Sequence, residues 1–101
     1  MHNDCKLARN MKKARKMKKV GDDAHHIFPQ AFRDVFFDPI LHIDIDDVKY
    51  GVWLEGRFHK KYAYAYNKIW KKAIDANIIT EKNAMRYAKK FMKVIYGVKL
   101  K

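Results

Sequence analysis

Residues 24–30 read Ala24-His25-His26-Ile27-Phe28-Pro29-Gln30, and this stretch decides how the rest of the chain is interpreted. The two adjacent histidines stand between the acidic pair Asp22-Asp23 and an apolar run. Pro29 closes an extended segment, because the residue before a proline is pushed towards β or polyproline geometry. Adjacent side chains of an extended segment point to opposite faces, so His25 and His26 are able to take two different roles.

Helices and strands are predicted on both sides of this segment. Before it, weakly amphipathic spacing predicts a strongly basic helix over residues 6–19, stopped by Gly21. After it, a short helix fits residues 30–37 and ends at Asp38-Pro39, and a strand fits residues 50–54.

Two longer helices complete the chain. Apolar residues at helical spacing predict a helix from Arg57 to about Ala76, and a second helix extends over residues 80–96, from the N-cap Thr80 to a stop at Gly97. The order is helix, strand, helix, strand, helix, helix. We therefore expect a mostly helical α+β fold, with residues 1–101 forming one domain.

The net charge of +12 is concentrated at the two ends of the chain. Residues 1–20 carry +7 and residues 80–101 carry +6, whereas the middle of the chain carries −1. Such basic flanks attract polyanions and give salt-dependent affinity, so a nucleic acid is the first partner to expect. A membrane surface or an acidic protein would be attracted as well.

Cysteine content and hydropathy limit the other function classes. The single cysteine, Cys5, cannot form an internal disulfide, so the fold does not require an oxidising compartment. No apolar run approaches the ~18 residues of a membrane span, and the first residues lack the apolar core of a signal peptide. We expect export, if it occurs, to use another device or a longer protein from which this chain is cut.

Three histidines are candidates for metal-assisted hydrolysis of a phosphodiester. That reaction requires an activated water, a cation on the phosphoryl oxygens and stabilisation of the departing oxygen. One of His25 and His26 would hold the metal while the other faces the attacking water. His59, near the start of a helix whose apolar stripe is formed by other residues, is the candidate ligand from elsewhere in the chain.

The chain resembles the HNH, or His-Me finger, nucleases. The resemblance covers about Leu7 to Ile74 and rests on the order of AHHIFP, a short helix, the segment GVWL and a helix containing Phe58-His59 followed by YNKIW. More narrowly, it is similar to the His-His branch found as toxin domains of bacterial polymorphic and contact-delivered systems. That branch is related in site design to colicin-type DNases.

The resemblance implies a fold, an activity and roles for individual residues. It implies a ββα-metal core over about residues 22–74, flanked by the two basic helices, with His25 and His59 as metal ligands and His26 as general base. The metal would be one divalent ion (Zn, Ni, Mg or Mn). The nucleic acid would be DNA rather than RNA, cut with little sequence specificity. Beside the resemblance, the sequence itself places Arg57, Lys60 and Lys61 around His59, where their charges can contact phosphates near the metal.

It also implies a biological setting of bacterial competition. The nuclease would be a secreted or delivered effector domain that acts in the cytoplasm of the target cell. A cognate immunity protein would neutralise it in the producer. An acidic inhibitor would suit the charge of +12.

The sequence departs from the family pattern at two positions. The helix of the His-His nucleases usually carries a second histidine four residues after the first, and Ala63 occupies that position here. Another group replaces the ligand, the metal binds more weakly, or Ala63 was introduced to inactivate a toxic protein; we favour the last as a hypothesis. Many HNH proteins also have an asparagine that orients the base, where this chain has Tyr50 or Gly51, so a backbone carbonyl is the expected substitute.

Other interpretations stay open beside the nuclease. In one, the chain is a non-catalytic basic module that binds nucleic acid, with structural or zinc-stabilising histidines. His42 is expected on the surface or in packing, Asp22 and Asp23 in a solvated turn unless they bind a metal or a histidine, and Trp70 in the core. Helical spacing buries Tyr62 and Tyr66 and leaves Tyr64 as the candidate for stacking on bases.

Overall fold

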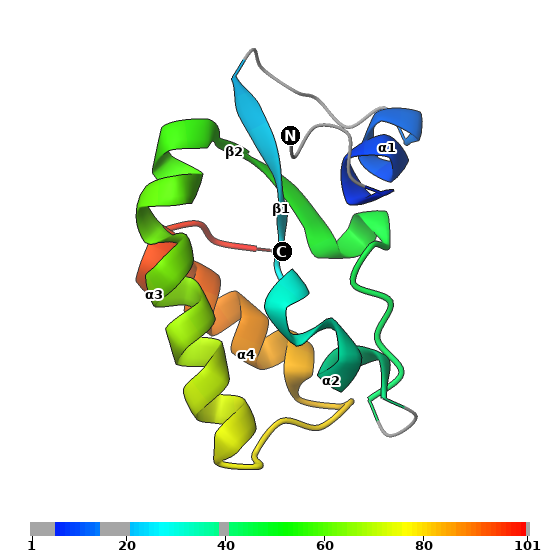
Figure 1. The fold of residues 1–101 in the computed structure, drawn as a ribbon, viewed down its shortest axis with the longest axis vertical. Helices are drawn as coiled ribbons and strands as arrows, with labels where there is room; N and C mark the ends of the chain where they lie inside the picture. Colours follow the sequence, from blue (N-terminus) through cyan, green and yellow to red (C-terminus); the bar gives the residue numbers. More distant parts are fainter. Residues whose placement is uncertain (1–5, 15–20, 39–40, 101) are drawn as a thin grey trace.

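The fold is built around a two-stranded antiparallel sheet, shown by a computed structural model that describes residues 6–14, 21–38 and 41–100 (Figure 1). Strand β1 (Asp22–His26) pairs with strand β2 (Gly51–Glu55). The register sets His25 opposite Val52 and His26 opposite Gly51. The predicted mostly helical α+β fold is confirmed.

Helices precede, connect and follow the two strands. The structure contains α1 (Lys6–Lys13), the 3₁₀ turn η2 (Gln30–Phe32), α2 (Arg33–Phe37), η3 (Val48–Tyr50), α3 (Gly56–Asp75), α4 (Ala84–Phe91) and the π-helical segment η4 (Met92–Tyr96). The predicted helix after Arg57 is confirmed as α3, and the predicted short helix consists of η2 and α2. Cys5, the end of the predicted basic helix at residues 15–19, and Pro39 lie outside the described residues. No helix in the described part of the chain combines the length and hydrophobicity needed to cross a membrane.

The last helix starts later than predicted. α4 begins at Ala84, because Thr80 and Asn83 first close a turn on themselves: the Thr80 hydroxyl accepts from the Asn83 amide (3.2 Å), and the Asn83 side chain accepts from the Thr80 amide (2.8 Å). Such reciprocal bonds satisfy amides that a helix start leaves without partners. The predicted stop at Gly97 is confirmed, since this residue takes the left-handed conformation with φ 68°.

The two faces of the sheet are covered by different helices. α1 packs on one face, where Leu7, Ala8 and Met11 form a small cluster with Ala24 of β1. The opposite face meets α3 and the larger core, which includes Phe28, Phe36, Tyr66 and Trp70. Figure 1 shows α1 and α3 on opposite sides of the strand pair. His25 and His26, as neighbours on β1, therefore face different surroundings.

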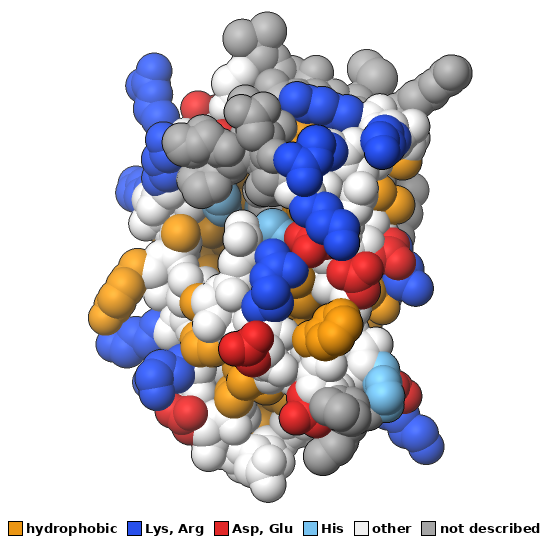
Figure 2. Space-filling view, turned by 45° about the vertical axis from the view of Figure 1, so that its right-hand side comes forward, with side chains coloured by type: hydrophobic (Ala, Val, Ile, Leu, Met, Phe, Trp, Pro, Cys, Tyr) orange, Lys and Arg blue, Asp and Glu red, His pale blue; other side chains and the backbone are white. Residues whose placement is uncertain are grey.

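The positive charge is not spread evenly over the surface. On the face shown in Figure 2, acidic side chains gather right of centre and near the bottom, close to an exposed hydrophobic side chain. Lys and Arg side chains gather in the upper part and at the left margin of the same view, and others lie at the centre and lower right, beside the acidic ones. On this face a polyanion would therefore meet the most uniform positive charge in the upper part.

Gly51 allows α1 to lie close to the sheet. A Cβ atom at this position would stand 2.7 Å from both Leu7 Cδ1 and Met11 Sδ, and both side chains are fully buried. Replacing Gly51 by alanine is expected to lower the free energy of unfolding by about 1–3 kcal/mol through overpacking. Urea unfolding measures the effect, and adding Met11→Ala should recover part of it. An unchanged Gly51→Ala protein would mean that α1 packs less tightly than described.

Candidate metal and catalytic site

His25 lies in an aromatic enclosure on the α3 side of the sheet. Its ring centroid is 5.0 Å from that of His59, 4.9 Å from that of Tyr66 and 5.0 Å from that of Tyr96. The residue is 4% exposed, and its Nε2 atom is buried without a hydrogen-bond partner. Burial, followed by the neighbouring His59 and His26, holds the pKa of His25 well below its ordinary value. His25 is therefore a neutral imidazole with an available electron pair.

His59 is brought to the same place by the first turns of α3. The Glu55 side chain caps this helix by accepting a hydrogen bond from the Phe58 amide (3.0 Å). The Tyr96 hydroxyl donates to the His59 carbonyl (3.1 Å), which ties η4 to the start of α3. His59 Nδ1 lies 3.4 Å from an Asp23 carboxylate oxygen. Asp23 therefore contacts a histidine, whereas the sequence favoured a solvated turn.

His26 faces the other side of β1 and is held by a carboxylate. Its Nε2 atom lies 2.9 Å from Asp46 Oδ1, and Arg33 Nη1 donates to Asp46 Oδ2 at 2.7 Å. The Gln30 side-chain amide lies 3.2 Å from His26 Nδ1. The expectation of a backbone carbonyl as the group that orients His26 is wrong: the loop before β2 brings the buried side chain of Asp46 to the ring.

The charge states of this network follow from burial and hydrogen bonding. Burial disfavours the Asp46 carboxylate, but the hydrogen bonds from Arg33 and His26 outweigh it and leave the pKa of Asp46 below its ordinary value. Burial also lowers the pKa of His26, despite the bond to Asp46. A neutral His26 with its proton on Nε2 and an ionised Asp46 follow. The Nδ1 atom is then a proton acceptor, as a general base requires.

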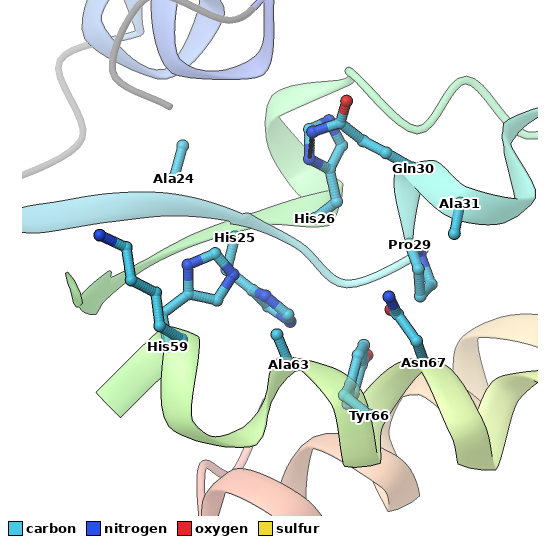
Figure 3. Close-up of a pocket in the computed structure, with 11 residues that line it drawn as sticks. Ala24, His25, His26, Pro29, Gln30, Ala31, His59, Ala63, Tyr66 and Asn67 are labelled. Carbon is cyan, nitrogen blue, oxygen red and sulfur yellow. Dashed lines mark hydrogen bonds between the residues drawn. The ribbon is translucent and has the colours of Figure 1, made fainter. Parts of the chain in front are cut away.

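One pocket of about 220 Å³ joins the three histidines. Its lining comes from the end of β1, from η2 and from one side of α3, and includes His25, His26, Gln30, His59, Lys60, Ala63, Tyr66 and Asn67. Figure 3 shows Ala63 pointing from α3 towards the His25 ring, on the same side of the helix as His59. The His26 ring points away from that pair, towards Gln30. The predicted convergence of His25 and His59 is thus present, with His26 on the far wall.

Two of the three imidazoles are suited to hold a metal ion. The buried Nε2 of His25 has no hydrogen-bond partner and could bind a metal when the ring proton is on Nδ1, and a carboxylate beside His59 is the usual support of a ligating histidine. Within residues 6–14, 21–38 and 41–100, however, no group of three or more His, Cys, Asp or Glu side chains is arranged to hold an ion. Ala63 leaves a space where a further ligand would point.

The remaining predicted residues lie at or near the pocket. Arg57, Lys60 and Lys61 are exposed, and of these Lys60 lines the pocket. His42 is exposed and Trp70 is fully buried, in agreement with their predicted surface and core positions. Sequence reasoning assigned no role to three residues that hold the site together: Asp46, Gln30 and Tyr96.

The chain was compared with known protein families, proteins and structures. The chain has no significant match among protein-family models, curated proteins or solved structures.

Proposed function

We propose that the protein is a metal-dependent endonuclease that hydrolyses phosphodiester bonds of nucleic acid, in a form weakened by Ala63. One observation carries the proposal: a single pocket is lined by two imidazoles in contact with each other and by a third that is held by a carboxylate. Structural histidines alone would need no such difference between His25, whose buried Nε2 atom has no hydrogen-bond partner, and His26, whose ring is oriented by Asp46. The resemblance to His-His toxin nucleases supports the same roles.

Each side chain has a task in this proposal. His26 Nδ1 takes a proton from the attacking water, while Asp46 keeps the other ring proton on Nε2 and stabilises the ring after it becomes charged. Gln30 is exposed, so the water can displace its amide from Nδ1. His25 and His59 would hold one divalent ion (Zn, Ni, Mg or Mn), which when bound would neutralise phosphoryl charge and stabilise the departing oxygen. Lys60 provides positive charge at the pocket wall.

We also propose a biological setting for this activity, that of bacterial competition. A toxin domain delivered into a competing cell, with DNA as substrate and an immunity protein in the producer, is what the family resemblance implies. The charge of +12 supports an acidic inhibitor, because opposite charges accelerate association.

A non-catalytic module that binds nucleic acid is the alternative. It is favoured by the aromatic rings that pack around His25, since these would also hold a purely structural histidine. In that case no metal would produce cleavage, even after the third ligand is supplied.

Plasmid nicking tests the proposal. Ala63→His should cut supercoiled DNA with at least one of Mg, Mn, Ni and Zn. Adding His26→Ala should lower the rate by roughly 10²–10⁴-fold, which is the usual contribution of a general base. His42→Ala, which removes an exposed histidine that does not line the pocket, is the matched control and should leave the rate unchanged. An inactive Ala63→His protein that binds metal would favour the non-catalytic module.

A further inference from the structure

A row of exposed side chains extends along α3 beside the pocket. Its members recur every three or four positions, so they are neighbours on one helical surface. We call this surface the α3 row, and all its residues are exposed: Arg57, Lys60, Tyr64, Lys68 and Lys71. It covers about 21 Å of helix at about 1.5 Å per residue. Lys71 pairs with Asp75 at 2.7 Å, which marks the end of the positive stretch.

Tyr64 is the one aromatic member of the row. It is 77% exposed, whereas the other five tyrosines of the chain are buried or half-buried. Lys60 lies four residues before it and Lys68 four residues after it, on the same side of the helix. A ring that is so exposed contributes little to the core, and between two cations it presents a flat face to an anionic partner.

The row leads to the pocket of the histidines. Lys60 belongs to both, since it is exposed on the row and also lines the pocket. A chain of phosphates that follows the row would therefore pass the pocket that His25, His26 and His59 share. The two surfaces are suited to one extended ligand.

We propose that the α3 row binds single-stranded nucleic acid, with a base stacked on Tyr64 and phosphates held by the flanking lysines and Arg57. Aromatic side chains combined with a positive track are the features that bind single strands, because every unpaired base has a free face for stacking. In a duplex the bases stack on one another, so Tyr64 would add nothing. The proposal rests on the proposed function, whose substrate class it names.

Binding in the presence of EDTA tests the row separately from cleavage. Fluorescence anisotropy would compare a labelled single strand, a duplex of the same length and an abasic strand that has the phosphates without the bases. Tyr64→Ala should weaken binding of the single strand by roughly 5- to 100-fold and leave the abasic strand unaffected. Tyr64→Phe should bind like the parent protein. Tyr64→Leu, which keeps apolar surface without a ring, should behave like Tyr64→Ala.

The lysines predict a different pattern. Lys60→Gln combined with Lys68→Gln should weaken all three ligands and reduce the salt slope for the single strand by about 1.4, at about 0.7 per phosphate contact. Lys89→Gln with Lys90→Gln, the same charge change on α4, is the matched control and should leave the slope unchanged. Thermal melting checks that each variant is folded.

Three results would overturn the proposal. These are an equal loss on the abasic strand in Tyr64→Ala, a duplex bound more tightly than the single strand, or an unchanged salt slope after the lysine changes. Because these measurements need no metal and no cleavage, failure of the nicking experiment leaves them valid. Likewise, if the α3 row does not bind single strands, the proposal for the histidine site is not contradicted.

Discussion

Replacing Ala63 by histidine is expected to raise the affinity of the protein for Zn or Ni by about 100-fold. Ala63 lies one turn after His59 on the same side of α3 and points towards the His25 ring (Figure 3). Structural zinc sites with four ligands gain about 10–16 kcal/mol, so one further imidazole supplies about 3 kcal/mol. Titration calorimetry on the intact chain and on the variant measures the gain without reference to cleavage.

A second added histidine provides the control for this prediction. Ala65 lies on the same helix and does not line the pocket, so Ala65→His adds an imidazole without completing the site. Its metal affinity should equal that of the parent. If both variants gain equally, the ion binds to exposed histidines in general. If neither gains, His25 is a structural residue held by its aromatic neighbours.

The sequence predicted the elements of the site better than the contacts that orient it. The pattern of apolar residues from Phe58 onwards predicts which side of α3 is buried, and Tyr66, Trp70 and Ala73 are buried in the structure. His59 lies three turns before Trp70 and therefore on nearly the same side of the helix. The alternation of side chains along β1 likewise directed His25 and His26 to different faces. Local periodicity was sufficient for these predictions because each depends on one element alone.

Contacts between distant segments could not be predicted in this way. Asp46 lies 20 positions after His26 and reaches it through a loop without helical or strand periodicity. One signal was present in the sequence, since Asp46 directly follows the apolar residues Ile43 and Ile45, and all three are buried in the structure. The contact with His26 could not be inferred from the sequence, because the loop contains several acidic residues that could equally have reached the ring. The same holds for Asp23 and His59, whose contact depends on how α3 meets β1.

Replacing Asp46 by asparagine is expected to reverse the tautomer of His26 and remove most of the activity. Arg33 can only donate, so the carbonyl oxygen of the new side-chain amide would face Arg33 and its NH₂ group would face His26 Nε2. The ring proton must then move to Nδ1, which can no longer take a proton from water. In the Ala63→His background, cleavage should fall by roughly 10²–10⁴-fold, as expected for a base in the wrong tautomer. Nitrogen-15 shifts of the His26 ring detect the change of tautomer in Asp46→Asn alone, without the Ala63→His substitution.

The same substitution has a stability effect with a definite pH dependence. Losing the ionised partner of Arg33 and His26 should lower the free energy of unfolding by about 2 kcal/mol at neutral pH. Because the pKa of Asp46 lies below its ordinary 3.8 in the folded protein, its contribution is fully present above that pH and is lost as the pH falls through the folded value. Urea unfolding from neutral to acid pH should therefore show the difference between Asp46→Asn and the parent shrinking only at the acid end.

Arg33→Gln separates the stability effect from the tautomer effect. The Arg33 side chain is 44% exposed, and its loss leaves Asp46 ionised and still bonded to His26 Nε2. This variant should be destabilised but keep the Nε2 proton, and its cleavage in the Ala63→His background should fall less than about tenfold, below the range expected for a lost base. Equal losses in Arg33→Gln and Asp46→Asn would mean that the carboxylate acts by holding the loop in place. An unchanged ring nitrogen spectrum in Asp46→Asn would remove Asp46 from the proton transfer altogether.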